Sequence, residues 1–145
     1  MRAKQYLPGA LALVVSLGAM LATGCGTSEE AMQKAAKSNA DKYYELVRLG
    51  KYEDAYRQTF SETYKGQLPI DTYTRYQQQY RSRLGQLEEF EVTESTVDAD
   101  AERISLTYSL KVGSAPDPVG EIVRLRKDGS EWRIDSIEPR LQRAK

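Results

Sequence analysis

The stretch Arg103-Ile-Ser-Leu-Thr-Tyr-Ser-Leu-Lys-Val112 alternates strictly between polar and apolar side chains. Successive side chains of a β-strand point to opposite faces, so a period of two places all the apolar residues of this stretch on one face. The apolar set consists of Ile104, Leu106, Tyr108, Leu110 and Val112. We therefore expect a half-buried strand, with one face in a core and the other in water.

Three further segments with strand character surround this one. They cover residues 87–97, 119–127 and 131–137. Asp128-Gly129 is a strong signal for a tight hairpin between the last two, and residues 98–102 form the turn between the first pair. Residues 113–118 contain two prolines, which cannot donate ladder hydrogen bonds, so a longer loop is expected there. Together the segments predict an antiparallel meander.

The residues before the strands have the periodicity of helices. From Met32 to Val47 the apolar residues recur at spacings of three and four, and Gly50 is a good C-terminal cap. Ser28 is placed to cap the start of this helix, with acidic residues in its first turn. A second, shorter helix is expected over residues 51–60, packed back on the first.

A third helix is expected after a break at Pro69. One further turn at residues 61–64 precedes this proline, and Asp71 can then cap a helix that ends at Gly85. Its apolar residues at helical spacing are Tyr73, Tyr76, Tyr80 and Leu84. Because helices precede the strands, we predict an α+β fold with N-terminal helices packed on a curved four-stranded antiparallel sheet.

The first 24 residues have the order of a secretory leader. Arg2 and Lys4 precede an apolar run over residues 7–22, which is shorter than the roughly 20 residues that a spanning helix needs. Leu21-Ala-Thr-Gly-Cys25 then resembles the bacterial lipobox, in which the cysteine thiol takes a diacylglycerol before the chain is cut in front of it. Ala22 stands where a leucine is commoner. The resemblance implies a lipid anchor on Cys25.

The alternative interpretation is that Cys25 is an incidental thiol in a plain signal peptide or in a short anchor that is never cut. Because it is the one cysteine in the sequence, an intramolecular disulfide is excluded. Two or more acyl chains, at about 0.8 kcal/mol per buried methylene, would hold the protein stably on a bilayer.

The resulting expectation is a lipid-anchored protein of the cell membrane or the outer membrane, with its domain facing the periplasm or the exterior. The expected parts are a signal peptide over 1–24, a lipidated tether over 25–30, a single α+β domain over 31–139 and a polar tail over 140–145.

Replacing Cys25 with serine tests the anchor, because the lipid is attached through sulfur. We expect Cys25→Ser to release the protein from the membrane fraction, as measured by cell fractionation and immunoblotting. A variant that stays membrane-bound at unchanged levels would contradict the lipid-anchor hypothesis.

The composition excludes several kinds of chemistry. Removing Arg2 and Lys4 with the leader lowers the cations from 21 to 19 while the acids stay at 21, so the formal charge becomes −2, which argues against a nucleic-acid partner. The sequence has no histidine, so histidine triads, Cys–His pairs and zinc sites are excluded. It also has no G-x-G-x-x-G motif. No cofactor is expected, and carboxylate, tyrosine and arginine chemistry remains.

Three features resemble those of nuclear transport factor two-like domains. Residues 47–56 resemble the junction of the first two helices, a turn of small residues followed by Tyr-x-x-Ala-Tyr. The tyrosine-bearing helix at 73–84 precedes the sheet, and Gly129-Ser-Glu-Trp-Arg-Ile134 is similar to the closing Gly-x-x-Trp-x-Ile of many bacterial members. The resemblance implies a cone-like fold that often encloses a pocket between helices and sheet. A cystatin-like helix on a sheet is the main alternative.

The resemblance also bears on function. Enzymatic members, including isomerases and dehydratases, place acid–base residues such as Asp or His in the pocket. This sequence has no histidine and no acid that matches their motif, so the resemblance supplies no catalytic residue. We expect a non-catalytic module that binds a small apolar ligand or another envelope protein. The alternative is a small isomerase-type enzyme with a pocket carboxylate.

Four aromatic residues are candidates for the site. Tyr73, Tyr76 and Tyr80 could line a ligand pocket, since a phenol combines an apolar body with a polar tip. The simpler interpretation is a helix face packed on the sheet with its hydroxyls at the rim. Trp132 is expected to lie in the core.

The last hairpin concentrates basic residues, and these have two interpretations. Arg124, Arg126, Lys127 and Arg133 could form a basic face that meets anionic lipid or a partner. Opposing acids are near in sequence, namely Glu121, Asp128 and Glu131. A solvated cross-strand mixture of both charges is therefore the favoured interpretation.

Overall fold

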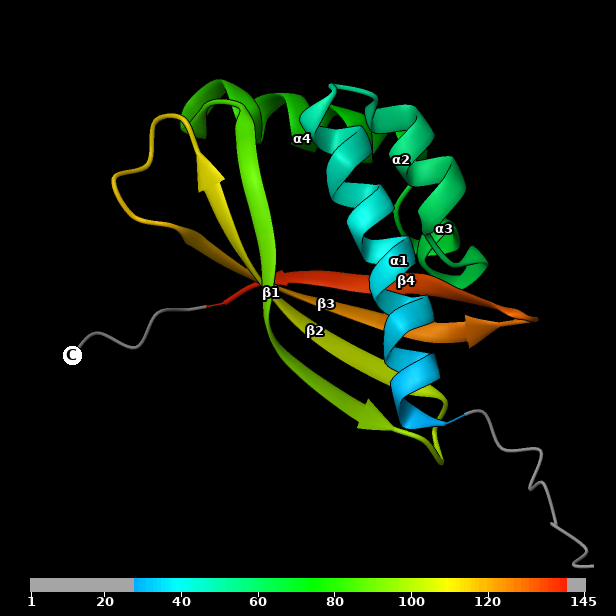
Figure 1. Cartoon of the computed structure of the whole chain (residues 1–145). Helices are drawn as coiled ribbons and strands as arrows, with labels where there is room; N and C mark the ends of the chain where they lie inside the picture. The colour runs from blue at the N-terminus through cyan, green and yellow to red at the C-terminus, as the bar shows by residue number, and fades with distance from the viewer. Residues whose placement is uncertain (1–27, 141–145) are drawn as a thin grey trace, which may run out of the picture.

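The computed structural model describes residues 28–140, and the expectations for the leader, for Cys25 and for residues 141–145 lie outside the described residues. Helices come first in the chain and strands follow (Figure 1). The helices are α1 (Glu29–Arg48), α2 (Tyr52–Thr59), α3 (Glu62–Gln67) and α4 (Ile70–Leu84). The strands are β1 (Leu87–Asp98), β2 (Arg103–Val112), β3 (Val119–Asp128) and β4 (Glu131–Pro139). Over residues 28–140 no helix has both the length and the hydropathy needed to cross a bilayer.

The strands form one antiparallel sheet in the order β1-β2-β3-β4, which confirms the predicted α+β class. The register shifts twice within β1, at Leu87/Glu89 and at Val92/Glu94, and once where β3 pairs with β4, at Arg124/Leu125. Such irregularities bend a strand and increase its twist. The sheet is therefore curved, and α1 crosses its concave face (Figure 1).

The helix ends follow the local sequence with one exception. The Ser28 hydroxyl accepts a hydrogen bond from the Ala31 N–H at 3.2 Å, as predicted for an N-cap. Gly85 ends α4 with a φ of +87°, a backbone conformation that residues with a Cβ rarely adopt. The prediction that Asp71 caps α4 is wrong. The N-cap is Pro69, two residues earlier, because the Pro69 carbonyl already accepts a hydrogen bond from the Tyr73 N–H at 3.0 Å.

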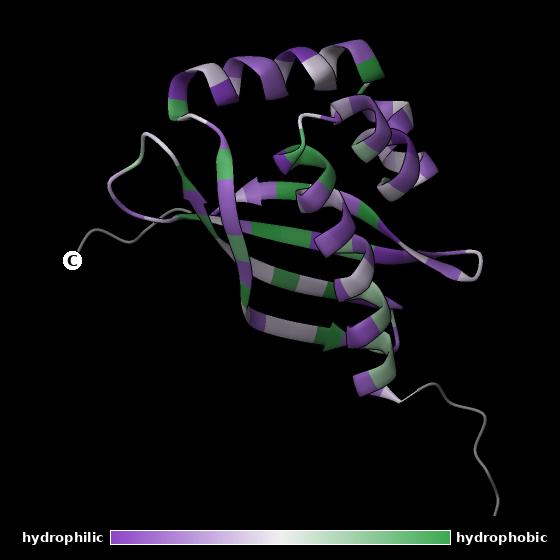
Figure 2. Ribbon diagram, turned by 45° about the horizontal axis from the view of Figure 1, so that its top comes forward, coloured by the Kyte–Doolittle hydropathy of each residue, from purple (hydrophilic) through white to green (hydrophobic). Residues whose placement is uncertain are grey.

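The core lies between α1 and the inner face of the sheet. All five apolar residues of the alternating β2 stretch are buried, and Figure 2 shows apolar residues interleaved with polar ones along the strands. Ala36 and Ala40 on α1 are fully buried, and their small side chains let the helix approach the strands closely. Trp132 is only 7% exposed, which confirms its predicted place in the core.

The basic residues of the last hairpin are paired with acids. Arg124 pairs with Glu138, and Arg133 pairs with Glu131. Arg126 lies 3.8 Å from Asp135, and Lys127 lies 3.6 Å from Glu102. The predicted mixture of both charges is confirmed, but of the three acids named for it only Glu131 pairs with one of these cations among the described residues. Glu121 points to the opposite face of the sheet.

Helix α4 is held at one end of the domain, and this placement creates the site. Its main packing partner is α2 rather than a strand. At its C-terminal end the Leu84 carbonyl accepts from the Ser114 N–H at 2.8 Å, which ties the helix to the loop between β2 and β3. Figure 1 shows α4 beside this loop, above the ends of the strands. A cavity lies between α4 and the sheet.

Candidate functional site: a tyrosine-lined cavity

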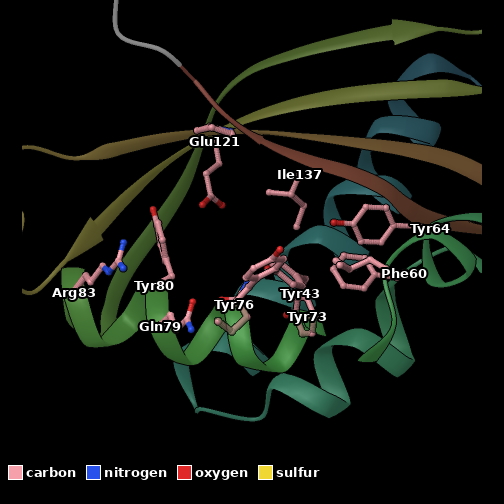
Figure 3. A pocket seen from close by; sticks show the side chains of 13 residues that line it. Tyr43, Phe60, Tyr64, Tyr73, Tyr76, Gln79, Tyr80, Arg83, Glu121 and Ile137 are labelled. Carbon is pink, nitrogen blue, oxygen red and sulfur yellow. The ribbon is translucent and has the colours of Figure 1, made fainter. Parts of the chain in front are cut away.

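A cavity of about 400 Å³ lies between α4 and the sheet (Figure 3). This volume falls in the range of about 300–1,000 Å³ that is typical of small-molecule sites. Six aromatic side chains line it, namely Tyr43, Phe60, Tyr64, Tyr73, Tyr76 and Tyr80. Leu68, Ile137 and Pro139 add apolar surface, and Glu121 is the carboxylate among the described residues that line it. A mostly apolar wall with a few polar groups is characteristic of ligand-binding pockets.

The tyrosines of α4 lie at different depths of this cavity. Tyr73 is 3% exposed, and its ring packs edge-on against Phe60 with centroids 5.2 Å apart. Tyr80 is half-buried, whereas Tyr76 is 58% exposed. The helical spacing of three and four therefore brings all three residues to one cavity. Trp132 lies outside it, against α1.

Glu121 enters the cavity from β3. Its carboxylate projects from the sheet toward α4, beside Tyr80 and Ile137 (Figure 3). One oxygen accepts a hydrogen bond from the Tyr44 hydroxyl at 2.8 Å, and the other makes no hydrogen bond with the described residues. Burial raises the pKa of Glu121, although the Tyr44 hydrogen bond and the Arg81 charge both act to lower it. The ionised carboxylate is therefore incompletely compensated.

The sequence contains a signal for Glu121. Val119, Val123 and Leu125 pack inward from β3, and the side-chain period of two puts Glu121 on the same face. Glu121 pairs with Tyr108 of the neighbouring strand β2. The alternation of polar and apolar residues in β2 predicts that Tyr108 faces the core. A glutamate at a strand position where the alternating pattern places apolar, core-facing residues indicates a buried acid.

The charge on Glu121 also acts on the surrounding phenols. Burial is the main cause that raises the pKa of Tyr44 and of Tyr80, and Glu121 raises both further. Burial and then the neighbouring Tyr73 raise the pKa of Tyr43, with Glu121 contributing as well. These phenols therefore stay protonated, and a protonated phenol can donate a hydrogen bond.

Helix α4 contains all the buried side-chain nitrogen and oxygen atoms without a hydrogen-bond partner in residues 28–140. They are Thr74 Oγ1, Gln77 Oε1, and Nε and Nη1 of Arg81, whereas the buried Tyr73 hydroxyl interacts with the Tyr43 hydroxyl. Buried polar groups are normally satisfied, so this concentration on one helix is unusual. It lies on the element that forms one wall of the cavity, as expected where a structure gives up stability for function.

Arg81 is the charged member of this group. It is 6% exposed, and its guanidinium lies 4.9 Å from the centroid of the Tyr80 ring. It attracts the Glu121 carboxylate, yet the two form no ion pair in the part of the chain that the structure describes. The favourable contact of Arg81 is therefore with an aromatic face rather than with the acid.

The described residues provide no obvious metal centre. No group of three or more His, Cys, Asp or Glu side chains between residues 28 and 140 is arranged to hold an ion. The chemistry available in the cavity is hydrogen bonding by phenols and amides, charge on Glu121, and contact with aromatic rings.

Comparison with known proteins gives a likeness in fold. No family model matches the chain, and no curated protein matches it. Among solved structures, the intermembrane space region of the chloroplast protein ARC6 superposes with a TM-score of 0.50 at 13% identity, over 73% of this chain and 94% of that one. A de novo designed protein with a curved β-sheet gives a TM-score of 0.49 at 14% identity, over 72% and 97%. The likeness to the chloroplast protein shows the fold alone.

Replacing Glu121 with glutamine tests the electrostatic description of the site. The pKa of Glu121 is higher in the folded than in the unfolded protein, so the folded state keeps the proton between the two values. Its ionisation therefore lowers stability as pH rises through that interval. The cost is complete above the folded-state pKa and absent below the unfolded-state value.

We expect Glu121→Gln to raise the melting temperature at neutral pH, with a gain that shrinks as the pH falls through that interval and is lost below it. Thermal melts followed by circular dichroism measure both effects. A glutamine variant that is less stable at neutral pH, or whose gain is the same at every pH, would contradict this description.

Proposed function

We propose that this protein is a lipid-anchored, non-catalytic binding module of the bacterial cell envelope, and that its ligand is a small molecule held in the tyrosine-lined cavity. The observation that carries the proposal is the combination of a 400 Å³ cavity, six aromatic walls and one partly buried carboxylate with a free oxygen.

The shape and chemistry of the cavity support binding. Aromatic side chains provide large contact areas with little loss of conformational freedom, because a tyrosine has only two side-chain torsions. Tyr43, Tyr73 and Phe60 are held rigidly by ring contacts with centroids 5.2–5.5 Å apart. The cavity is therefore largely formed before a ligand arrives, which lowers the entropy lost on binding.

The sequence supports the location. The lipobox-like segment ends at Cys25, and α1 begins four residues later at Glu29. A lipid on Cys25 would keep the domain close to the surface of the membrane. A ligand or partner would then be met in the periplasm or outside the cell, and no nucleic acid is involved.

A second candidate function is catalysis of the isomerase type, and Glu121 is the observation that favours it. A general base needs a raised pKa and access to the substrate, and Glu121 has both burial and a free oxygen that faces the cavity. Binding remains the better supported function. It requires only the cavity and its polar groups, whereas catalysis would also require a proton donor placed to act together with Glu121 on a substrate.

Titration with 2-naphthol tests the binding function. This molecule is apolar and has one hydroxyl that can donate to Glu121, so we expect saturable binding at one site by isothermal titration calorimetry. Tyr76→Ala removes an aromatic wall at the mouth and should weaken binding about two- to tenfold, corresponding to roughly 0.5–1.5 kcal/mol for an aromatic contact.

Leu49→Ala is the matched control, because Leu49 is 56% exposed and Tyr76 is 58% exposed, but Leu49 lies outside the cavity. The affinity of this variant should equal that of the unchanged protein. Unsaturable binding, or equal losses in the two variants, would contradict the proposed site.

A further inference from the structure

The walls and the charge of the cavity together favour one class of ligand. We propose that the ligand is an organic cation, an ammonium group attached to an apolar body, with Glu121 as its counter-ion. This inference rests on the proposed ligand-binding function and specifies the chemistry of the same site.

The Glu121 carboxylate has one oxygen available to a ligand. Tyr44 of α1 donates to the other oxygen at 2.8 Å. The neighbouring phenol of Tyr108, opposite on β2, is committed elsewhere, because it donates to Asp41 at 2.6 Å. An ammonium group supplies both the hydrogen-bond donors and the positive charge that the free oxygen lacks.

The aromatic walls also favour a cation. The face of an aromatic ring is electrostatically negative and attracts a cation within about 6 Å of its centroid. Arg81 already makes such a contact with Tyr80, at 4.9 Å. Five further aromatic side chains, those of Tyr43, Phe60, Tyr64, Tyr73 and Tyr76, line the same cavity, so the apolar body attached to a cation at Glu121 would contact aromatic surface.

The arginines of α4 do not neutralise the acid. Arg81 attracts Glu121 from beyond ion-pair distance, and Arg83 is exposed where it borders the cavity. Burial still outweighs Tyr44 and Arg81 in its effect on the pKa of Glu121. A neutral ligand would leave this charge uncompensated, and an anionic ligand would add repulsion at short distance. Of the three kinds of ligand, only a cation compensates the negative charge of Glu121.

A series of three ligands of equal length tests the inference. The compounds are 4-phenylbutylammonium, 4-phenylbutan-1-ol and 4-phenylbutyrate, titrated calorimetrically into the full-length protein in neutral detergent micelles, with empty micelles as the blank. We expect the ammonium to bind about tenfold or more tightly than the alcohol, and the carboxylate to bind most weakly.

Two variants assign the preference to Glu121. Glu121→Gln keeps the shape of the side chain and removes its charge, so the affinities for ammonium and alcohol should become equal within about threefold. Glu138→Gln is the control, because Glu138 is exposed on β4 and pairs with Arg124 outside the cavity. It should keep the full preference of the unchanged protein.

The outcomes separate the two proposals. An alcohol that binds as tightly as the ammonium overturns the cation inference and leaves the binding function standing. Failure of all three compounds, together with failure of 2-naphthol, overturns both. Should Glu121→Gln not fold, the ranking of the three compounds by the unchanged protein decides the inference alone.

Discussion

The hydrogen bond from the Tyr44 hydroxyl to the Glu121 carboxylate is the interaction around which the site is organised. It is 2.8 Å long and joins α1 to β3 across 77 positions of sequence. Tyr44 is fully buried, and its ring lies 4.5 Å from that of Tyr108 and 5.0 Å from that of Tyr43, so the donor is held rigidly. One oxygen of an acid on the core face of the sheet is thereby satisfied, and the other is left for the cavity.

This arrangement costs stability, and the cost is concentrated on one side of the domain. An apolar residue at position 121 would continue the inward face formed by Val119 and Val123. Helix α4 likewise leaves polar atoms of Gln77 and Arg81 without partners among the described residues, and its main packing partner is α2 rather than a strand. Folded domains retain such features chiefly where function requires them, which agrees with a site between α4 and β3.

The sequence predicts the fold well because the spacing of apolar residues within each segment is enough to distinguish helices from strands. Alternation in β2, helical spacing before Val47, and glycines at positions 50 and 85 fix the elements without knowledge of tertiary structure. The cap of α4 is misassigned because a proline carbonyl can start a helix before the nearest acid does. The cavity could not be predicted, since it depends on how far α4 lies from the sheet. Glu121 could have been found from its place in the inward register of β3.

The most direct test of this account is a carbon-13 NMR titration of the Glu121 side-chain carboxyl in the unchanged protein, with Glu121→Gln to assign the signal. We expect a titration midpoint above the ordinary range of glutamate, because burial raises the pKa of this group. Saturation with 4-phenylbutylammonium should then move the midpoint downward, because a bound cation stabilises the ionised form. A midpoint within the ordinary range that does not respond to the ligand would contradict the account.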